Sequence, residues 1–249
     1  MRSNILPVLL LAAAVSACGG NDTPAAAQQG GTKRVDPAST GSVAGRVTFS
    51  GQAPAPAIVK VDTDPGCTAN GATVTDETLL VDGAGGVKNA FVYVKTGLEG
   101  YAFDAPSEPV IVDQQDCKYE PRVFGARVGQ TIEILNSDPT YHNVHAMPRV
   151  NGEFNESMPA QGMTMEKTFA APEIGVPLKC DVHPWMTSYA GIVAHPYFAV
   201  TGPDGRFSLP DLPAGTYTLE VWHETLGTRT QQITIAPKQQ ADAAFTFSG

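Results

Sequence analysis

The sequence predicts an all-β protein. Short runs rich in β-branched and aromatic residues recur along the chain, for example at 42–49, 90–94, 131–135 and 217–222. Gly, Pro and Asp residues separate these runs, and alternation over four to eight positions between turn residues is typical of strands in a sandwich or barrel. Helical periodicity is scarce, and the best candidate for a helix is a short one at 98–103.

The N-terminus has the pattern of an export signal. Arg2 supplies one cation, an apolar run extends from Ile5 to Val15, and small residues precede Cys18. Such a run is too short to span a membrane. The Val-Ser-Ala-Cys sequence resembles a bacterial lipobox, which implies that residues 1–17 are a signal peptide and that Cys18 becomes the lipidated first residue. An ordinary cleaved signal with an incidental Cys is the alternative.

The segment after this Cys predicts a flexible tether. Residues 18–41 carry almost no large apolar side chains, so they cannot bury enough surface to offset the entropy of ordering. Acyl chains on Cys18 would anchor the protein stably to a membrane. Because residue 19 is Gly rather than Asp, the usual inner-membrane retention signal is missing. We therefore expect an exported lipoprotein, at the outer membrane, that faces the periplasm or the cell surface.

The charge balance restricts the partners. The formal net charge is −9, and Lys and Arg residues never occur in clusters of more than two. This composition argues against nucleic acid, whose binding requires a basic face. Acidity is compatible with a cationic redox partner protein. Ser-His-Asp, paired-carboxylate and phosphate-loop patterns do not stand out, so we expect a carrier or binding protein rather than an enzyme.

A set of potential metal ligands is the most informative feature of the chain. Cys180, His183 and Met186 lie within one short segment, and His142 lies upstream. One thiolate, two imidazoles and one thioether are the ligands of a mononuclear blue-copper centre. Structural zinc sites seldom use a thioether. The set therefore predicts one copper ion that cycles between Cu(I) and Cu(II).

The surrounding sequence resembles the cupredoxin (plastocyanin-like) family. A strand at 129–136 ends at Asn136 and a loop delivers His142, after which a Cys-His-Met loop and a closing strand at 190–194 follow. The resemblance implies a Greek-key β-sandwich at 101–196. It also implies copper ligation by His142, Cys180 and His183. Met186 departs from the usual spacing of plastocyanin-like loops, which would place the Met where Ser188 stands.

Three residues near the ligands are further candidates. His145 lies three positions after His142, and an odd offset on an extended segment directs side chains to opposite faces. We therefore expect His142 to bind, and keep His145 as an additional ligand, an outward conduit or a solvated residue. By analogy with cupredoxins, the amide of Asn143 would tie the two ligand loops together, or it simply caps a turn. Trp185 would shield the copper, although packing explains it equally well.

The C-terminal part resembles a carboxypeptidase regulatory-like (prealbumin-like) β-sandwich. An Asp-Gly turn at 204–205 and a Pro-Ala-Gly-Thr-Tyr turn at 213–217 punctuate its strands. The strands that usually open such a domain match segments far upstream. We therefore expect a discontinuous sandwich, formed by 42–100 and 197–249, with the cupredoxin-like domain inserted. A simple tandem order is the competing scheme.

Cysteine use follows from these resemblances. An exported protein meets an oxidising compartment, in which paired cysteines persist. With Cys18 assigned to lipid and Cys180 to metal, Cys67 and Cys117 remain to form a disulfide. The rival pairing joins Cys67 or Cys117 to Cys180 and would remove the metal ligand.

The leading hypothesis is a lipid-anchored copper protein that transfers single electrons to a redox partner. A copper chaperone or buffer is the second hypothesis, because thioethers bind Cu(I); its additional ligands would be Met147, Met158, Met163 and Met165. A structural or glycan-binding surface protein is the third. A zinc site formed by Cys180 and three His residues (His142, His145 and His183) is a minor alternative. His195 and His223 are interpreted as structural or surface residues.

Overall fold

The computed structural model describes residues 31–61, 64–68 and 73–249. The export signal, the lipobox and Cys18 lie outside the described residues. Within them, regular structure is almost entirely β, which confirms the predicted class; the helices are a 3-10 turn, η1 (Pro37–Ser39), and one turn of α-helix, α1 (Pro65–Thr68). In the part of the chain that is described, no helix has the length and apolarity needed to cross a membrane.

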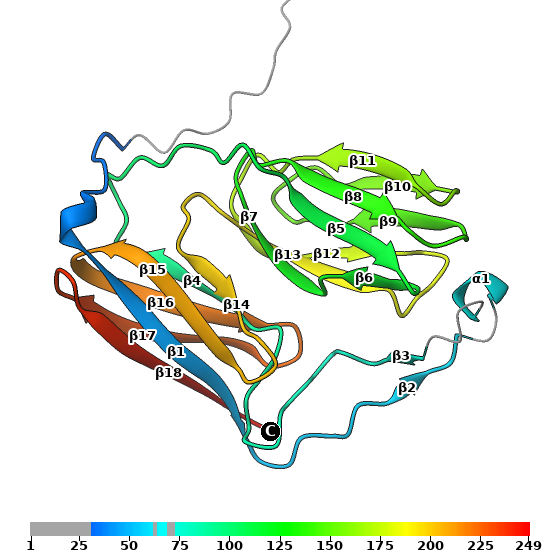
Figure 1. Ribbon diagram of the computed structural model, residues 1–249, viewed down its shortest axis with the longest axis horizontal. Helices are drawn as coiled ribbons and strands as arrows, with labels where there is room; N and C mark the ends of the chain where they lie inside the picture. The colour runs from blue at the N-terminus through cyan, green and yellow to red at the C-terminus, as the bar shows by residue number, and fades with distance from the viewer. Residues whose placement is uncertain (1–30, 62–63, 69–72) are drawn as a thin grey trace, which may run out of the picture.

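Strands from both ends of the chain form one β-sandwich, here called the terminal sandwich (Figure 1). One sheet has the order β15 (Arg206–Pro213), β1 (Thr40–Ser50) and β18 (Gln240–Ser248). The other has the order β14 (Phe198–Val200), β4 (Phe91–Thr96), β16 (Gly215–His223) and β17 (Gly227–Ile235). The strand β1 pairs antiparallel with β15 and parallel with β18. The fully buried core members include Val43, Val47, Val92, Leu209 and Leu219.

The chain between β4 and β14 forms a second β-sandwich, here called the inserted sandwich. Its five-stranded sheet has the order β10 (Phe154–Met158), β9 (His142–Ala146), β12 (Glu173–Lys179), β13 (Thr187–Val193) and β7 (Val123–Arg127). Its four-stranded sheet has the order β11 (Met163–Lys167), β8 (Ile132–Asn136), β5 (Val110–Gln115) and β6 (Lys118–Glu120). Inward-facing residues fill the space between them, among them Val112, Ile134, Val144, Val176 and Ile192.

The predicted helix at 98–103 does not form, and this prediction was wrong. Gly97 and Gly100 have φ angles of +106° and +83°, which interrupt any right-handed helix. Tyr101 is buried in the core of the terminal sandwich instead, and the ring of Phe103 stacks on it. The segment therefore belongs to the terminal sandwich, and the inserted sandwich begins at β5 rather than at residue 101.

The predicted tether also ends earlier than residue 41. Lys33 forms a β-bridge with Tyr101, and its ammonium group lies 4.3 Å from the centre of that ring. Asp36 then caps η1 by accepting a hydrogen bond from the N–H of Ala38. Low apolar content concealed these contacts, because a cation over an aromatic ring and a helix cap require no large apolar side chain.

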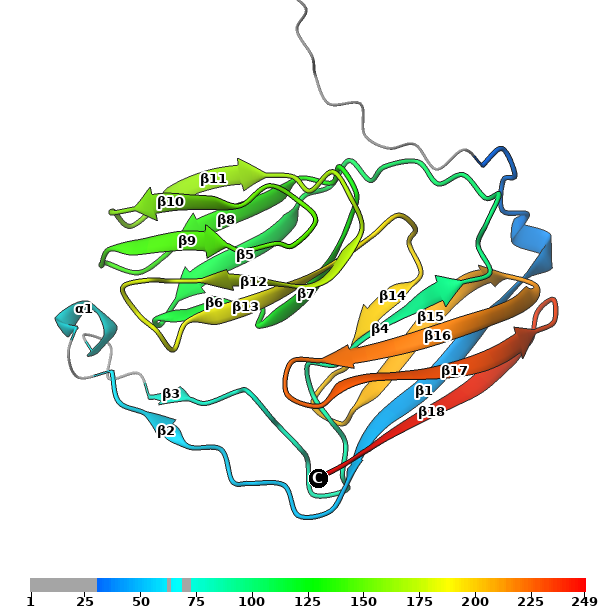
Figure 2. The same cartoon turned by 180° about the vertical axis from the view of Figure 1, so that it is seen from behind.

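An excursion between β1 and β4, here called the arm (residues 51–89), was not predicted. It leaves the terminal sandwich, reaches the inserted sandwich and returns (Figures 1 and 2). Within it, β2 (Ile58–Val59) pairs with β3 (Val74–Thr75), and α1 lies between them in sequence. Val61, Cys67 and Val74 are buried in the core of the inserted sandwich. The range 42–100 is therefore only partly a sandwich segment.

The two sandwiches meet through a small apolar cluster and a buried ion pair. Phe91 and Tyr93 of β4 pack against Val123 and Val193 of the inserted sandwich. Nearby, Nε and Nη2 of Arg122 donate to the two carboxylate oxygens of Glu224. Both charged side chains are nearly buried, so this pair fixes the relative position of the sandwiches.

Candidate metal centre

The loop after β8 positions the first imidazole. The amide nitrogen of Asn136 donates to the carbonyls of Thr140 and Met158, and its oxygen accepts the N–H of Asp138. These bonds hold the loop between β8 and β9 so that His142, the first residue of β9, lies fully buried between the sheets. The strand end at Asn136 and the following loop thus place His142 as the cupredoxin resemblance implies.

The loop between β12 and β13 positions the thiol and the second imidazole. The N–H of Cys180 donates to the carbonyl of Met186, and the N–H of Met186 donates to the carbonyl of His183. This tight closure turns Cys180 and His183 inward, and each of the two residues is only 2% exposed. The short loop is therefore sufficient to bring these two groups to one point.

Three ligand atoms converge at that point. The two Nδ1 atoms of His142 and His183 are 2.9 Å apart, and Sγ of Cys180 lies 3.9 Å from the first and 3.7 Å from the second. Metal ions bind His nitrogen at about 2.0–2.1 Å and Cys sulfur at about 2.3 Å. Three such ligands at the corners of a triangle around the ion lie about 3.8 Å apart for each sulfur–nitrogen pair and about 3.5 Å apart for the two nitrogens. The S–N distances fit such an ion, and the imidazoles would separate by about 0.6 Å.

Each imidazole directs its other nitrogen to a carboxylate. Nε2 of His142 lies 2.9 Å from Oδ2 of Asp138, and Nε2 of His183 lies 2.8 Å from Oδ2 of Asp64. Asp138 in turn accepts the N–H groups of Asp116 and Cys117. A carboxylate on the remote nitrogen fixes the tautomer and orientation of a metal-binding imidazole and makes it a stronger ligand. Both His residues are therefore arranged to offer Nδ1.

Electrostatics favour the ionised thiol. Burial opposes ionisation of Cys180, but hydrogen bonds with His142 and His183 lower its pKa to about 6. Burial also opposes the charged form of His142, yet hydrogen bonds with Asp138 and Cys180 raise its pKa to about 9. The pKa of His183 is raised in the same way, against burial, by hydrogen bonds with Cys180 and Asp64. A thiolate is the form that binds metal, so the site is prepared for it.

The side chain of Asn143 joins the two ligand loops. Its Oδ1 accepts the N–H of Asp181 at 2.7 Å and lies 3.4 Å from Sγ of Cys180. Its Nδ2 donates to Asp181 and to Asn155. The predicted tie between the His142 loop and the Cys180 loop is therefore present in the hydrogen bonds.

Met186 and Trp185 border the site. Met186 is 1% exposed and packs in the core of the inserted sandwich, while its backbone bridges Cys180 and His183. Its role as the thioether ligand stays a prediction. The ring of Trp185 lies 5.2 Å from that of His183, and its Nε1 donates to the carbonyl of Cys117. Trp185 thus covers one side of the His183 imidazole, where we expected shielding.

His145 lies outside the ligand group. Its side chain is 21% exposed, and its ring nitrogens contact Asp181 at 3.1 Å and Glu153 at 3.0 Å. The hydrogen bond with Glu153, which has the larger effect, and that with Asp181 both raise the pKa of His145. His142, Cys180 and His183 form one of the groups that could hold a metal ion among the described residues, and His145 does not belong to it. Alternation along β9 explains the separation, because the side chain of His145 faces the opposite side of the strand from that of His142.

The other sequence candidates occupy separate places. Met158, Met163 and Met165 line a cavity of about 240 Å³ between β10 and β11, and Met147 follows β9. His195 and His223 are buried in or beside the terminal sandwich, where burial lowers the pKa of each to about 4. Neither of these two His residues is near the ligand group.

Sequence reasoning missed the two carboxylates on the imidazoles. Asp138 precedes His142 by four residues in a loop that carried a detectable signal. Asp64 carried none, because it lies 119 residues before His183 and reaches it through the arm.

Cys67 and Cys117 form a disulfide with their Cα atoms 5.5 Å apart, and this bond attaches the arm to the inserted sandwich.

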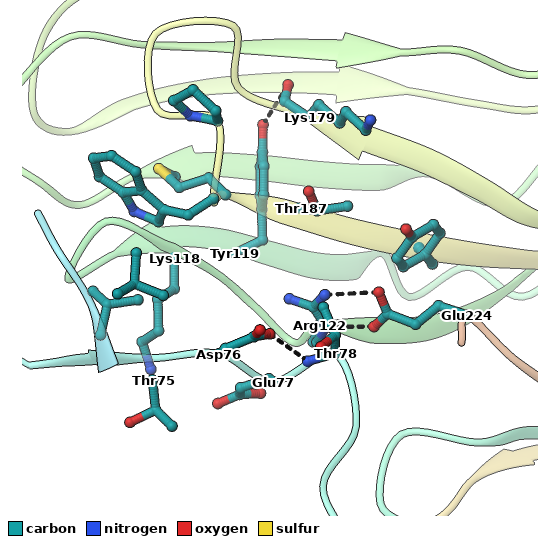
Figure 3. A pocket seen from close by; sticks show the side chains of 16 residues that line it. Thr75, Asp76, Glu77, Thr78, Lys118, Tyr119, Arg122, Lys179, Thr187 and Glu224 are labelled. Carbon is teal, nitrogen blue, oxygen red and sulfur yellow. Dashed lines mark hydrogen bonds and ion pairs between the residues drawn. The ribbon is translucent and has the colours of Figure 1, made fainter. Parts of the chain in front are cut away.

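A cavity of about 270 Å³ lies beside the Cys180 loop, between the arm and the inserted sandwich (Figure 3). Trp185 and Met186 are among its apolar lining residues. The ion pair of Arg122 and Glu224 also borders it (Figure 3). The hydroxyl of Tyr119 donates to the carbonyl of Asn143 and contacts that of Lys179. The residues that line the cavity carry both positive and negative charges.

A comparison with known protein families identifies a part of the terminal sandwich. A family model of the carboxypeptidase regulatory-like domain matches residues 190–248, which span β14 to β18. The structure adds β1 and β4 to this unit. No match was found among curated proteins.

Several solved copper-protein structures resemble part of the chain. A mutant of amicyanin in the Cu(I) state is 24% identical over 36% of this chain and 86% of its own, with a TM-score of 0.31. An oxidised amicyanin mutant is 18% identical over 47% and 92%, with a TM-score of 0.32. A copper-containing nitrite reductase from Thermus scotoductus is 24% identical over 42% and 25%, with a TM-score of 0.31. At these TM-scores the likeness carries no weight for function.

Proposed function

We propose that this protein is an exported, lipid-anchored mononuclear copper protein that transfers single electrons. The observation that carries the proposal is the buried convergence of two imidazole Nδ1 atoms and one thiol, with His142, His183 and Cys180 as the ligands. Bound copper would supply a Cu(I)/Cu(II) couple in a site of type 1 character, and a soft thiolate with two imidazoles suits that ion. Met186 would supply its thioether as a further ligand.

The protein side of the mechanism is preorganisation. Strand ends and hydrogen-bonded loops hold the three side chains, so little rearrangement of the protein would accompany a change of charge on a bound metal. Asp138 holds the proton on Nε2 of His142 and leaves Nδ1 directed inward. Asn143 restrains the Cys180 loop, because its amide oxygen accepts the N–H of Asp181. Burial excludes water, which keeps the thiolate from competing side reactions. We assign a carrier role rather than an enzymatic one.

A spectrum tests this function. Adding Cu(II) to the purified protein should give an intense thiolate-to-copper band in the visible, with one copper per chain by metal analysis. Cys180→Ser should abolish the band, whereas His145→Gln, the matched control outside the ligand group, should retain it. A colourless Cu(II) adduct that is unchanged by Cys180→Ser would refute the proposal.

The export and partner proposals rest on the sequence. Lipid on Cys18 would place the protein at the outer membrane, facing the periplasm or the cell surface, where a redox partner protein would receive its electrons. Metabolic labelling with a fatty acid in a bacterial host should mark the wild-type chain and not Cys18→Ala. Equal labelling of both would exclude Cys18 as the lipid site.

A copper chaperone or buffer is the second candidate function. It is favoured by the cavity that Met158, Met163 and Met165 line together, since thioethers prefer Cu(I). This function predicts more than one Cu(I) per chain and loss of the additional ion in Met163→Leu/Met165→Leu. A stoichiometry of one in both proteins would exclude it.

A further inference from the structure

The arm places a carboxylate on the outer edge of a proposed copper ligand. Asp64 belongs to the excursion of the terminal sandwich, yet its Oδ2 lies 2.8 Å from Nε2 of His183 in the inserted sandwich. The His183 residue is 2% exposed, so the edge of this imidazole is covered. The ligand atom of the same ring, Nδ1, faces Cys180 on the other side.

Several bonds hold Asp64 in this position. Its Oδ1 accepts the N–H of Gly66 at 2.7 Å, and its Oδ2 also accepts the hydroxyl of Thr140 at 3.0 Å. Thr140 lies in the loop that delivers His142. The imidazole of His183, the N–H of Gly66 and the hydroxyl of Thr140 together direct this carboxylate.

The disulfide connects Asp64 to the support of the other imidazole. The N–H of Cys67 donates to the carbonyl of Asp64, and Sγ of Cys67 lies 3.7 Å from Nε2 of His183. Cys67 is bonded to Cys117, whose N–H donates to Asp138. Asp138 in turn contacts Nε2 of His142. A continuous chain of bonds therefore connects Asp64 with Asp138, the two carboxylates that contact the imidazoles, and the disulfide is its central covalent link.

We infer that Asp64 is a positioning residue for His183, supplied by the arm and secured by the Cys67–Cys117 disulfide, so that a segment from outside the two sheets of the inserted sandwich completes the metal centre. This inference rests on the proposed copper function for its consequence in metal binding, but not for the contact itself. By accepting the Nε2 proton, the carboxylate keeps the Nδ1 lone pair directed at the metal position and raises the basicity of the ring.

Copper affinity is the first measurement. Removing such a partner typically lowers metal affinity about 10–100-fold. Asp64→Ala should therefore lose affinity for copper by that factor in a competition titration with a chromogenic chelator, using the full exported chain. Asp64→Asn, whose amide oxygen still accepts from Nε2, should lose less. Asp76→Asn is the matched control, because Asp76 lies on the same arm and caps the N–H of Thr78.

The second measurement needs no copper. In ¹⁵N-edited NMR spectra of the metal-free protein, the Nε2–H proton of His183 should be visible and protected from exchange with water. Asp64→Ala should lose this protection, and Cys67→Ala/Cys117→Ala should reduce it because the arm is released. If Asp64→Ala fails to fold, Asp64→Asn decides, since removing the charge from the acceptor must shift the Nε2–H resonance.

The outcomes separate the two proposals. A wild-type protein without the visible copper band refutes the copper function, while a protected Nε2–H that depends on Asp64 still supports the positioning role. An Nε2–H resonance and a copper affinity that both stay at the wild-type values in Asp64→Ala would overturn the inference. So would an unshifted resonance in Asp64→Asn.

Discussion

Replacing Cys67 and Cys117 together by Ala should destabilise the protein by a magnitude that follows from the chain path. The bond closes a loop of 50 residues, which leaves the arm, passes through β4 of the terminal sandwich and returns to β6. In the chain-entropy model a loop of this length contributes about 4 kcal/mol. For a chain of this size, the melting temperature changes by about 2–4 °C for each kcal/mol of stability, so it should fall by about 8–16 °C.

The assay is thermal and denaturant unfolding of the metal-free protein, followed by fluorescence. The two Trp residues report different sandwiches, because Trp185 packs with the inserted core and Trp222 belongs to β16. A Trp222→Phe background isolates the signal of Trp185. The double variant should match wild-type protein treated with a dithiol reductant. A decrease in the free energy of unfolding of less than about 1 kcal/mol would refute this reasoning, since the chain-entropy model gives a decrease of about 4 kcal/mol.

Three other perturbations have defined outcomes. Arg122→Ala should cost about 3–5 kcal/mol of unfolding free energy in a denaturant titration, because it leaves Glu224 buried without its partner, and Arg122→Met/Glu224→Leu should cost less. The metal-free protein should lose the thiolate absorbance of Cys180 as the pH falls through its lowered pKa of about 6. The contribution of this thiolate to the free energy of unfolding is complete above the ordinary pKa of 9.0, and it is lost as the pH falls through about 6. The pKa values of His195 and His223 are lowered by burial from 6.5 to about 4, so the unfolded chain binds more protons between these values, and stability should decrease as pH falls from 6.5 to 4. Substituting both by Gln should flatten that dependence, and an unchanged slope would contradict it.

Local patterns carried most of what could be predicted. The strand before Asn136 and the short loop from Cys180 to Met186 specify their own geometry, because each ligand follows a strand end by a few residues. The same locality explains why His145 could be assigned to the other face from its spacing alone. The convergence of His142, Cys180 and His183 could therefore be predicted from the sequence, while their role as ligands stays a prediction.

Long-range features were not within reach. Nothing in the sequence near Asp64 indicates that the arm crosses to the inserted sandwich, because that path depends on contacts of Val61, Cys67 and Val74 with a core formed later in the chain. The helix expected at 98–103 failed for a related reason. Burial of Tyr101 against the terminal core outweighed local propensity, and the backbone at Gly97 and Gly100 is not helical.

The two carboxylates also determine how the protein would tune the metal. Asp64 and Asp138 each place negative charge on the remote nitrogen of an imidazole ligand, and the thiolate of Cys180 adds a third negative group. Negative charge near a metal stabilises the higher oxidation state, and hydrogen bonds to ligands are a principal means of tuning potential. Asp64 is about a quarter solvent-exposed whereas Asp138 is nearly buried, so solvent screens the former more strongly. Asp64 on the arm would therefore act chiefly on the orientation of His183, and Asp138 chiefly on the charge of the site.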